Sequence, residues 1–217
     1  MRTLEEIWPV FGLRVTAGPL QLTPVQDQDI PALVDLAEQG IHGPADMPFL
    51  VPWSATPASE LGRTMAGYYW RTRAEFGPAK WDLELAVRWD GVVAGVQGVR
   101  TADYLVTRTG ETGSWLGRAH QGRGIGTLMR QTVCALLFDH LDAQEVTSGA
   151  FEDNPASLAV SRKVGYSDNG VVRMRRREGE MALLRRVRLS PDALVRSDYS
   201  LDVEGVVPLR RLIGLDG

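Results

Sequence analysis

The sequence predicts an α+β protein in which helices flank one mixed sheet. Segments of alternating apolar and polar residues, typical of strands, recur along the chain. Longer segments with apolar residues at helical spacing lie between them. Turn signals of glycine and proline separate the segments. Some strands follow each other as hairpins and others are separated by a helix, which favours a mostly antiparallel sheet of mixed connectivity.

The first half of the chain predicts a strand pair, two helices and a hairpin. A lead-in at 1–12 precedes them, followed by strands at 13–16 and 20–22, a helix that opens at Thr23-Pro24 and ends at Gly40, a helix at 59–76, and strands at 81–89 and 92–99. Proline fits the first turn of a helix. Asp90-Gly91, between the last two strands, is a strong two-residue hairpin signal.

The second half predicts alternating strands and helices. The expected order is a strand at 114–117, a glycine-rich turn, a helix to Leu141, a strand at 146–151, a helix from Asn154-Pro155 to Gly165, and a hairpin of 171–177 with 181–189. Asparagine is a favoured helix cap, and proline is favoured at the first helical position. We expect residues 1–190 to form one domain. We expect 191–217 to be an extension that packs on this domain or on an oligomer partner.

Composition and charge restrict the class of protein. The 217 residues are 44% hydrophobic with a net charge of −3, which gives no reason to expect a nucleic-acid or membrane partner. A single cysteine, Cys134, excludes an internal disulfide, and no Cys/His spacing suggests a metal, so we expect none. There is no signal-peptide pattern, and no apolar run approaches the roughly 20 residues that cross a bilayer. We therefore expect a cytoplasmic protein.

The most informative stretch is the turn at 120–127, where Gly122, Gly124 and Gly126 alternate. It lies between a predicted strand and a predicted helix. The free N–H groups of such a turn and the positive end of the helix dipole bind phosphate. A Rossmann fingerprint has a different glycine spacing, and a P-loop ends in Gly-Lys-Ser/Thr. Phosphate binding and a merely flexible loop remain as the interpretations.

Two motifs in this order resemble the GNAT superfamily of acetyl-CoA-dependent N-acyltransferases. Gln121–Gly126 matches the family pattern Gln/Arg-x-x-Gly-x-Gly/Ala, and Asn154–Ser157 with Lys163–Tyr166 resembles the second signature. Trp115-Leu116-Gly117 resembles the RimJ/RimL branch. More narrowly, the chain resembles actinobacterial GNAT proteins associated with succinyl-CoA in Met47-Pro48-Phe49 with Val51-Pro52-Trp53, in the run Gly113–Gly117 and in its long tail. The resemblance covers residues 13–190 and implies the GNAT fold, a central, mostly antiparallel sheet with splayed strands flanked by helices.

This resemblance implies that coenzyme A lies along a splayed strand and the glycine turn. The backbone of Leu116 and Gly117 would bind the pantetheine arm. The N–H groups of residues 121–126 would hold the pyrophosphate, where glycine allows close approach. The expected coenzyme A contacts are Trp115, Leu116, Gly117, Arg118, Gln121, Gly122, Arg123, Gly124, Ile125, Gly126, Thr127, Asn154, Ser157, Ser161 and Lys163. The co-substrate is expected to be acetyl-CoA or succinyl-CoA.

The resemblance also implies the catalytic acid but leaves the base open. Many GNAT enzymes use a tyrosine as the acid, and that position is Ser161 here, so Ser157 is expected to protonate the departing thiolate. Asn154 is expected to cap its helix and to bind pantetheine or orient the substrate. The candidate general bases are Glu84, Glu111, Asp153 and His42. Each of them has an alternative interpretation as a surface charge or a cap.

The expected function is therefore an N-acetyltransferase that acts on a small amine or a protein N-terminus by direct transfer. The first alternative is an N-succinyltransferase of the same fold, and the second is a non-catalytic acyl-CoA-binding or regulatory protein. The proline-rich apolar segment 42–58 either caps a core or lines a pocket. The expected acceptor contacts there are His42, Met47, Phe49 and Trp53. Together with the apolar tail, this segment favours a homo-oligomer.

Overall fold

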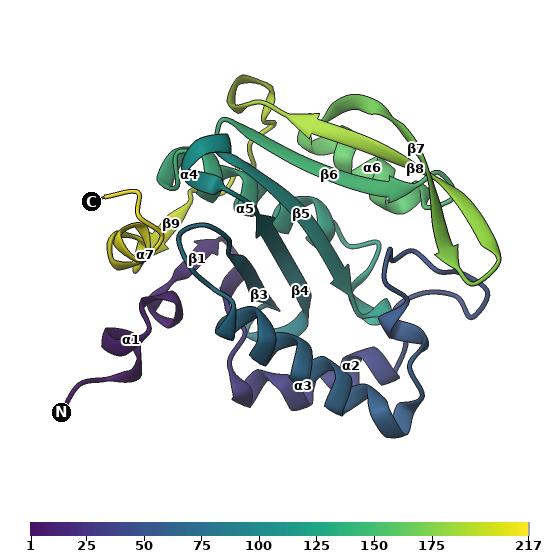
Figure 1. The fold of residues 1–217 in the computed structure, drawn as a ribbon, viewed down its shortest axis with the longest axis horizontal. Helices are drawn as coiled ribbons and strands as arrows, with labels where there is room; N and C mark the ends of the chain where they lie inside the picture. The colour runs from purple at the N-terminus through teal and green to yellow at the C-terminus, as the bar shows by residue number, and fades with distance from the viewer. Residues whose placement is uncertain (217) are drawn as a thin grey trace.

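Nine strands form one sheet in the computed structural model, which describes residues 1–216 (Figure 1). The sheet order is β7-β8-β6-β5-β4-β3-β2-β1-β9. The strands are β1 (Arg14–Ala17), β2 (Leu20–Pro24), β3 (Asp82–Trp89), β4 (Val92–Thr101), β5 (Thr109–Leu116), β6 (Glu145–Phe151), β7 (Ser167–Arg177), β8 (Glu180–Leu189) and β9 (Asp202–Glu204). Only β5 and β6 pair in parallel. The predicted mixed, mostly antiparallel sheet is confirmed.

The helices cover both faces of this sheet. They are α1 (Leu4–Ile7), α2 (Ile30–Glu38), α3 (Ala58–Ala74), α4 (Tyr104–Thr107), α5 (Ile125–His140), α6 (Pro155–Val164) and α7 (Val206–Leu212). On one face, α2 and α3 pack over Ala86 and Val96. On the other, α5 packs over Leu83, Leu85 and Val99 in the main core (Figure 1). Within residues 1–216, no helix has the length and apolarity that a bilayer crossing requires.

The helix predicted to open at Thr23-Pro24 starts later than expected, so that prediction is wrong. Pro24 ends β2 and lies opposite Leu85 of β3. A short 3-10 turn follows, and α2 begins at Ile30. Every second residue of β2 is buried, so the packing of β2 into the core outweighs the local preference of proline for a helix start. The apolar stripe of α2 is buried as its spacing predicted.

The parallel strands β5 and β6 separate halfway along their length. Thr109–Thr112 pairs with Glu145–Ser148, after which the two strands share no pairs. Beyond that point β5 stays paired with β4 through Leu116, and β6 stays paired with β8 through Phe151. The strands therefore diverge and leave a V-shaped opening between them, as the predicted splay requires.

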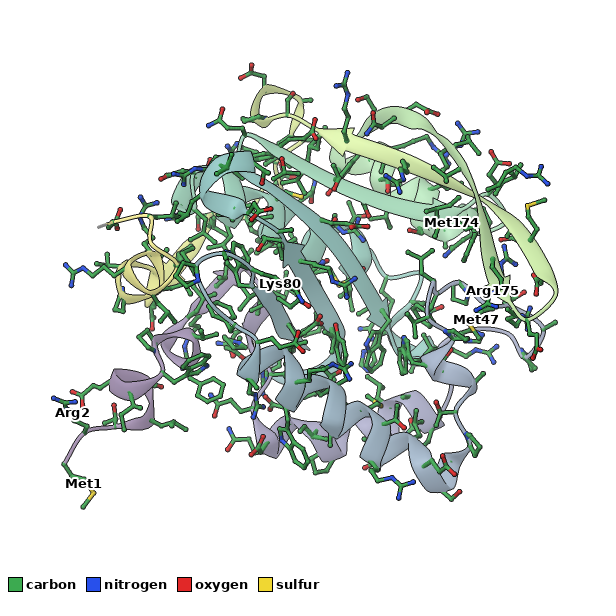
Figure 2. All side chains as sticks on the ribbon, in the orientation of Figure 1. Met1, Arg2, Met47, Lys80, Met174 and Arg175 are labelled. Atoms are coloured by element: carbon green, nitrogen blue, oxygen red, sulfur yellow. The ribbon has the colours of Figure 1, made fainter. Side chains whose placement is uncertain are left out.

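Two segments extend the sheet at its opposite edges. The sequence did not predict β9, which pairs with β1 and is followed by α7, whose Leu209 is buried in the main core. At the other edge, the β7–β8 hairpin reaches the loop at 41–57, where Arg177 Nη2 donates a hydrogen bond to the Ala45 carbonyl at 3.2 Å. Figure 2 labels Met47 on this loop and Arg175 on the hairpin. The loop and the hairpin tip thus meet across the open side of the V.

Candidate active site

A cleft of about 1650 Å³ opens where β5 and β6 diverge. Its walls are α3, the loop at 41–53, the start of α5, the start of α6 and the tip of the β7–β8 hairpin. The expected site residues that line it are His42, Met47, Phe49, Trp53, Glu84, Glu111, Trp115, Leu116, Arg118, Gln121, Gly122, Gly124, Gly126, Thr127, Asp153, Asn154, Ser157 and Lys163. The structure thus brings the expected donor, catalytic and acceptor residues into one cavity.

The glycine turn presents free donors at the start of α5. Gly122 has φ 72° and Gly124 has φ 82°, both in the left-handed region. A Cβ on either residue would meet nothing within 4 Å, so backbone conformation, not crowding, requires glycine there. Within residues 1–216, the N–H groups of residues 122–126 donate to no protein acceptor. Five such donors beside the positive end of a helix are an arrangement that can bind an anion.

Gln121 holds the turn in place. Its backbone N–H donates to the Arg118 carbonyl at 3.2 Å, so this donor is already used by the protein. Its side-chain Nε2 donates to the carbonyls of Ile41 at 2.6 Å and Leu116 at 2.8 Å. One amide therefore ties the turn both to the end of β5 and to the loop at 41–53.

Four of the expected coenzyme A contacts lie outside the cleft lining. The side chain of Ile125 is fully buried, although its N–H belongs to the free set. Gly117 has no room for a Cβ, which would lie 2.4 Å from a leucine of α2. Ser161 is buried and donates to the Ser157 carbonyl at 3.1 Å. Arg123 is exposed.

Asn154 and Ser157 form the start of α6 at the cleft wall. The Ser157 N–H donates to Asn154 Oδ1 at 3.1 Å, which confirms Asn154 as the helix cap. The Ser157 hydroxyl forms no hydrogen bond within residues 1–216 and lies partly buried in the cleft lining. A ligand in the cleft can therefore receive its proton.

Glu84 lies on the face of β3 that α3 covers. Tyr68 Oη donates to Glu84 Oε1 at 2.5 Å. Burial raises the pKa of Glu84 above its ordinary value, and the hydrogen bond from Tyr68 partly opposes this shift. Desolvation also raises the pKa of Tyr68, so the phenol stays a donor. A carboxylate with a raised pKa in a cleft is a candidate general base.

Two glycines keep the surface beside Glu84 open. Gly98 of β4 pairs with Glu84, and Gly113 of β5 pairs with Gly98. A Cβ on Gly98 would lie 2.9 Å from Glu84 Oε2, so a larger residue would displace the carboxylate. Gly113 directly follows Thr112, the last residue of β5 that pairs with β6. Gly98 and Gly113, here called the glycine floor, lie between the Glu84 carboxylate and the opening where β5 and β6 diverge.

The other candidate bases are placed differently. Glu111 is exposed at the cleft rim, beside Arg100 of β4. Asp153 forms an ion pair with Arg176, which donates a hydrogen bond to it at 2.6 Å. His42 has both ring nitrogens engaged, one with Ser54 and one with a backbone carbonyl, each at 2.8 Å. Glu84 lines the cleft and burial raises its pKa, which makes it the leading candidate base.

A buried arginine that the sequence did not single out lies beneath the opening. Arg130 of α5 is 4% exposed and borders the cleft. It donates to Ser148 Oγ of β6 at 3.1 Å and to Ser114 Oγ of β5 at 3.0 Å, bridging the strands where they part. Within residues 1–216 it forms no ion pair. A long amphipathic helix pattern gives no sign that one of its arginines is buried.

The apolar loop both lines the cleft and packs on the protein. Trp53 lies 5.5 Å from Trp115 of β5 and 5.1 Å from Phe49, measured between ring centroids. Met47 is 3% exposed. The two interpretations of this segment, a cap on a core and a pocket wall, therefore apply together.

The chain belongs to the acetyltransferase (GNAT) domain family, whose model matches residues 20–167. It is similar to the putative ribosomal N-acetyltransferase YdaF of Bacillus subtilis (strain 168), with 28% identity over 91 residues. The match covers 42% of this chain and 49% of that protein, so the chain spans about half the length of the curated relative it matches.

Solved structures share the fold at low sequence identity. Mycobacterium smegmatis RimJ in complex with CoA-disulfide is 20% identical with a TM-score of 0.71, covering 86% of this chain and 88% of that one. RimL, described as a ribosomal L7/L12 alpha-N-protein acetyltransferase in complex with coenzyme A, is 19% identical with a TM-score of 0.64, covering 81% and 96%. The expected GNAT fold, with its likeness to the RimJ/RimL branch, is confirmed.

Proposed function

We propose that this protein transfers an acetyl group from acetyl-CoA to the amine of a protein N-terminus or a small molecule. The observation that carries the proposal is the set of five free N–H groups at the glycine turn, in the same cleft as Ser157 and Glu84. RimJ and RimL, which share the fold, are described in complexes with coenzyme A or its disulfide. The self-immunity acetyltransferase MccE, with a TM-score of 0.64 and 18% identity, is described with acetyl-CoA.

The cleft fits coenzyme A at three points. The N–H groups of residues 122–126 can bind the pyrophosphate, and Arg118 and Lys163 line the cleft with positive charge. Past Thr112, the edge of β5 faces the opening and no longer pairs with β6, so its backbone groups can bind an extended pantetheine arm. Bound there, acetyl-CoA supplies an acyl group activated as a thioester.

Residues of the chain take part in two proton transfers during the reaction. A protonated amine cannot attack, so Glu84 accepts a proton from it, directly or through water on the glycine floor. As the N–C bond forms and the C–S bond breaks, the nitrogen loses its second proton to water and the Ser157 hydroxyl donates a proton to the sulfur. Ser157 then regains a proton from solvent, and Glu84 releases the proton that it accepted. The diverging strands orient the two substrates, so no covalent enzyme intermediate is needed.

A carboxylated donor such as succinyl-CoA is the second candidate, favoured by Arg130. A buried guanidinium whose partners are all neutral is costly, and a carboxylate on the acyl chain would neutralise it through strong charge-assisted hydrogen bonds. Replacing Arg130 with glutamine would then lower the rate with succinyl-CoA more than the rate with acetyl-CoA. Equal losses with both donors would refute this candidate.

The deciding experiment incubates the protein with acetyl-CoA or succinyl-CoA and a panel of peptides and small amines. Free thiol release reports turnover, and mass spectrometry identifies the acylated amine. We expect acetylated product with at least one primary amine, at a rate lowered in Ser157→Ala. Tight coenzyme A binding without turnover on any amine would instead support a non-catalytic acyl-CoA-binding protein.

A further inference from the structure

The cleft is basic, although the whole chain carries a net charge of −3. Eight arginines and lysines line it, against five aspartates and glutamates. Three of the eight are already paired, because Arg100, Arg176 and Arg177 form ion pairs with carboxylates. The other five have no carboxylate partner within residues 1–216. The cleft therefore offers positive charge that the protein itself does not neutralise.

These unpaired cations fall into separate groups. Arg118 and Lys163 belong to the glycine turn region and to α6, where donor phosphates are expected, and Arg130 lies beneath the opening. The remaining two, Arg63 and Arg71, are both on α3, on the opposite wall. The donor site gives them no role.

Arg63 and Arg71 stand on one face of α3 with Gly67 midway between them. All three are exposed and line the cleft. Eight residues of helix separate the arginines by about 12 Å along the axis. A Cβ on Gly67 would meet nothing within 4 Å, so no packing in the protein explains this glycine, which is unfavourable inside a helix. The three residues, here called the α3 face, leave open space between two positive charges.

The α3 face lies next to the candidate base. The Arg71 guanidinium is 5.9 Å from the centroid of the Tyr68 ring, and the Tyr68 hydroxyl donates to Glu84. An amine that gives its proton to Glu84 is therefore one aromatic side chain away from Arg71. The glycine floor beside Glu84 has no side chains to obstruct an extended backbone.

We propose that the α3 face selects acceptors in which acidic residues follow the reactive N-terminus. The acceptor is then an acidic amino-terminal segment of a protein, whose amine lies at Glu84 and whose carboxylates pair with Arg71 and Arg63. This inference rests on the proposed N-acetyltransferase function. Because the α3 face is exposed, the rest of a protein acceptor can leave the cleft over α3.

The test compares two synthetic hexapeptides that begin with serine, one continuing with Asp and Glu residues and the other with Asn and Gln. Steady-state kinetics are measured for the full chain and for the double variant Arg63→Glu/Arg71→Glu. The matched control is Arg173→Glu/Arg211→Glu, which makes the same charge change at two exposed positions outside the cleft. Thermal melts verify that every variant is folded.

We expect the unmodified protein to prefer the acidic peptide through a lower KM with a similar kcat. The double variant should raise the KM for the acidic peptide about tenfold, since each exposed ion pair contributes about a two- to fivefold effect and reversal adds repulsion. The KM for the neutral peptide and for acetyl-CoA should stay unchanged, as should every parameter of the control. High salt should weaken the preference in the unmodified protein.

If the unmodified protein acetylated the acidic and the neutral peptide equally well, or if the control variant raised the KM for the acidic peptide as much as the double variant, this inference would be refuted. The proposed N-acetyltransferase function would then still stand. A raised KM for acetyl-CoA in the double variant would also refute it, because the arginines would then serve the donor. Failure to acetylate any peptide or amine would refute the proposed function, and the inference with it.

Discussion

The substitution Glu84→Gln tests whether Glu84 acts as the general base. Glutamine keeps the shape of the side chain and an oxygen that can accept the Tyr68 hydrogen bond, but it cannot take a proton from the acceptor amine. A general base contributes about 100- to 10,000-fold. Because the cleft is open to water, which can accept the proton instead, we expect the low end. The expected loss in kcat is about 100-fold, equivalent to about 2.7 kcal/mol.

The same variant has a defined effect on stability. Burial raises the pKa of Glu84 in the folded protein above its ordinary value of 4.5. The contribution of this carboxyl to stability is therefore fully present below that ordinary pKa and is lost as pH rises through the raised one. Glutamine does not titrate. We thus expect the melting temperature of Glu84→Gln, relative to the unmodified protein, to rise between pH 4 and pH 8.

The assay combines peptide acetylation rates from pH 5 to pH 9 with thermal melts from pH 4 to pH 8. In the unmodified protein, kcat/KM should fall as pH drops through the raised pKa of Glu84, because the base becomes protonated. In Glu84→Gln, this fall in kcat/KM at low pH should be absent. Full activity with an unchanged pH profile would show that Glu84 is not the base. If the melting temperature of Glu84→Gln relative to the unmodified protein did not rise from pH 4 to pH 8, the desolvation argument would be refuted.

Four further substitutions test other parts of the site. Gly124→Val should abolish coenzyme A binding in calorimetry without unfolding the protein, because a β-branched residue is strained at φ 82° and the turn must change shape; unchanged affinity would disprove the phosphate turn. Ser157→Ala should lower kcat about tenfold or more while the Kd for coenzyme A changes little; full activity would remove Ser157 as the acid. Gly98→Ala should lower kcat, because the new Cβ would displace the Glu84 carboxylate. Gly113→Ala has open space around its Cβ position and should change only the KM for the acceptor; an equal loss of kcat in both variants would contradict the proposed geometry.

The sequence predicted best where a structure is decided by a few adjacent residues. Asp90 and Gly91 have φ values of 49° and 81° and form the expected hairpin turn. Asn154 caps α6 through its own side chain, as its residue type favours. The glycine turn is likewise encoded locally, because Gly122 and Gly124 adopt the positive φ values that favour glycine. Each of these features depends on local backbone geometry, which a short stretch of sequence encodes.

Features that depend on distant partners could not be predicted in this way. Pro24 became the end of a strand because β3 pairs with it, a contact about sixty residues away. The pairing of β9 with β1 joins the two ends of the chain and leaves no local signal. Glu84 differs from the other candidate bases through its burial under α3, the hydrogen bond from Tyr68 and the glycine opposite it. Selecting one carboxylate from four therefore needed the tertiary structure.

The bridge made by Gln121 has a consequence for the order in which substrates bind. Its side-chain amide joins the glycine turn to Ile41, the residue next to His42 at the start of the loop that lines the other side of the cleft. When phosphate fixes the turn, the amide also restrains the beginning of this loop. We expect the donor to bind first and to pre-organise the acceptor wall, giving a sequential, compulsory-order pattern in two-substrate kinetics. In Gln121→Ala, this coupling would be lost and binding would become random in order.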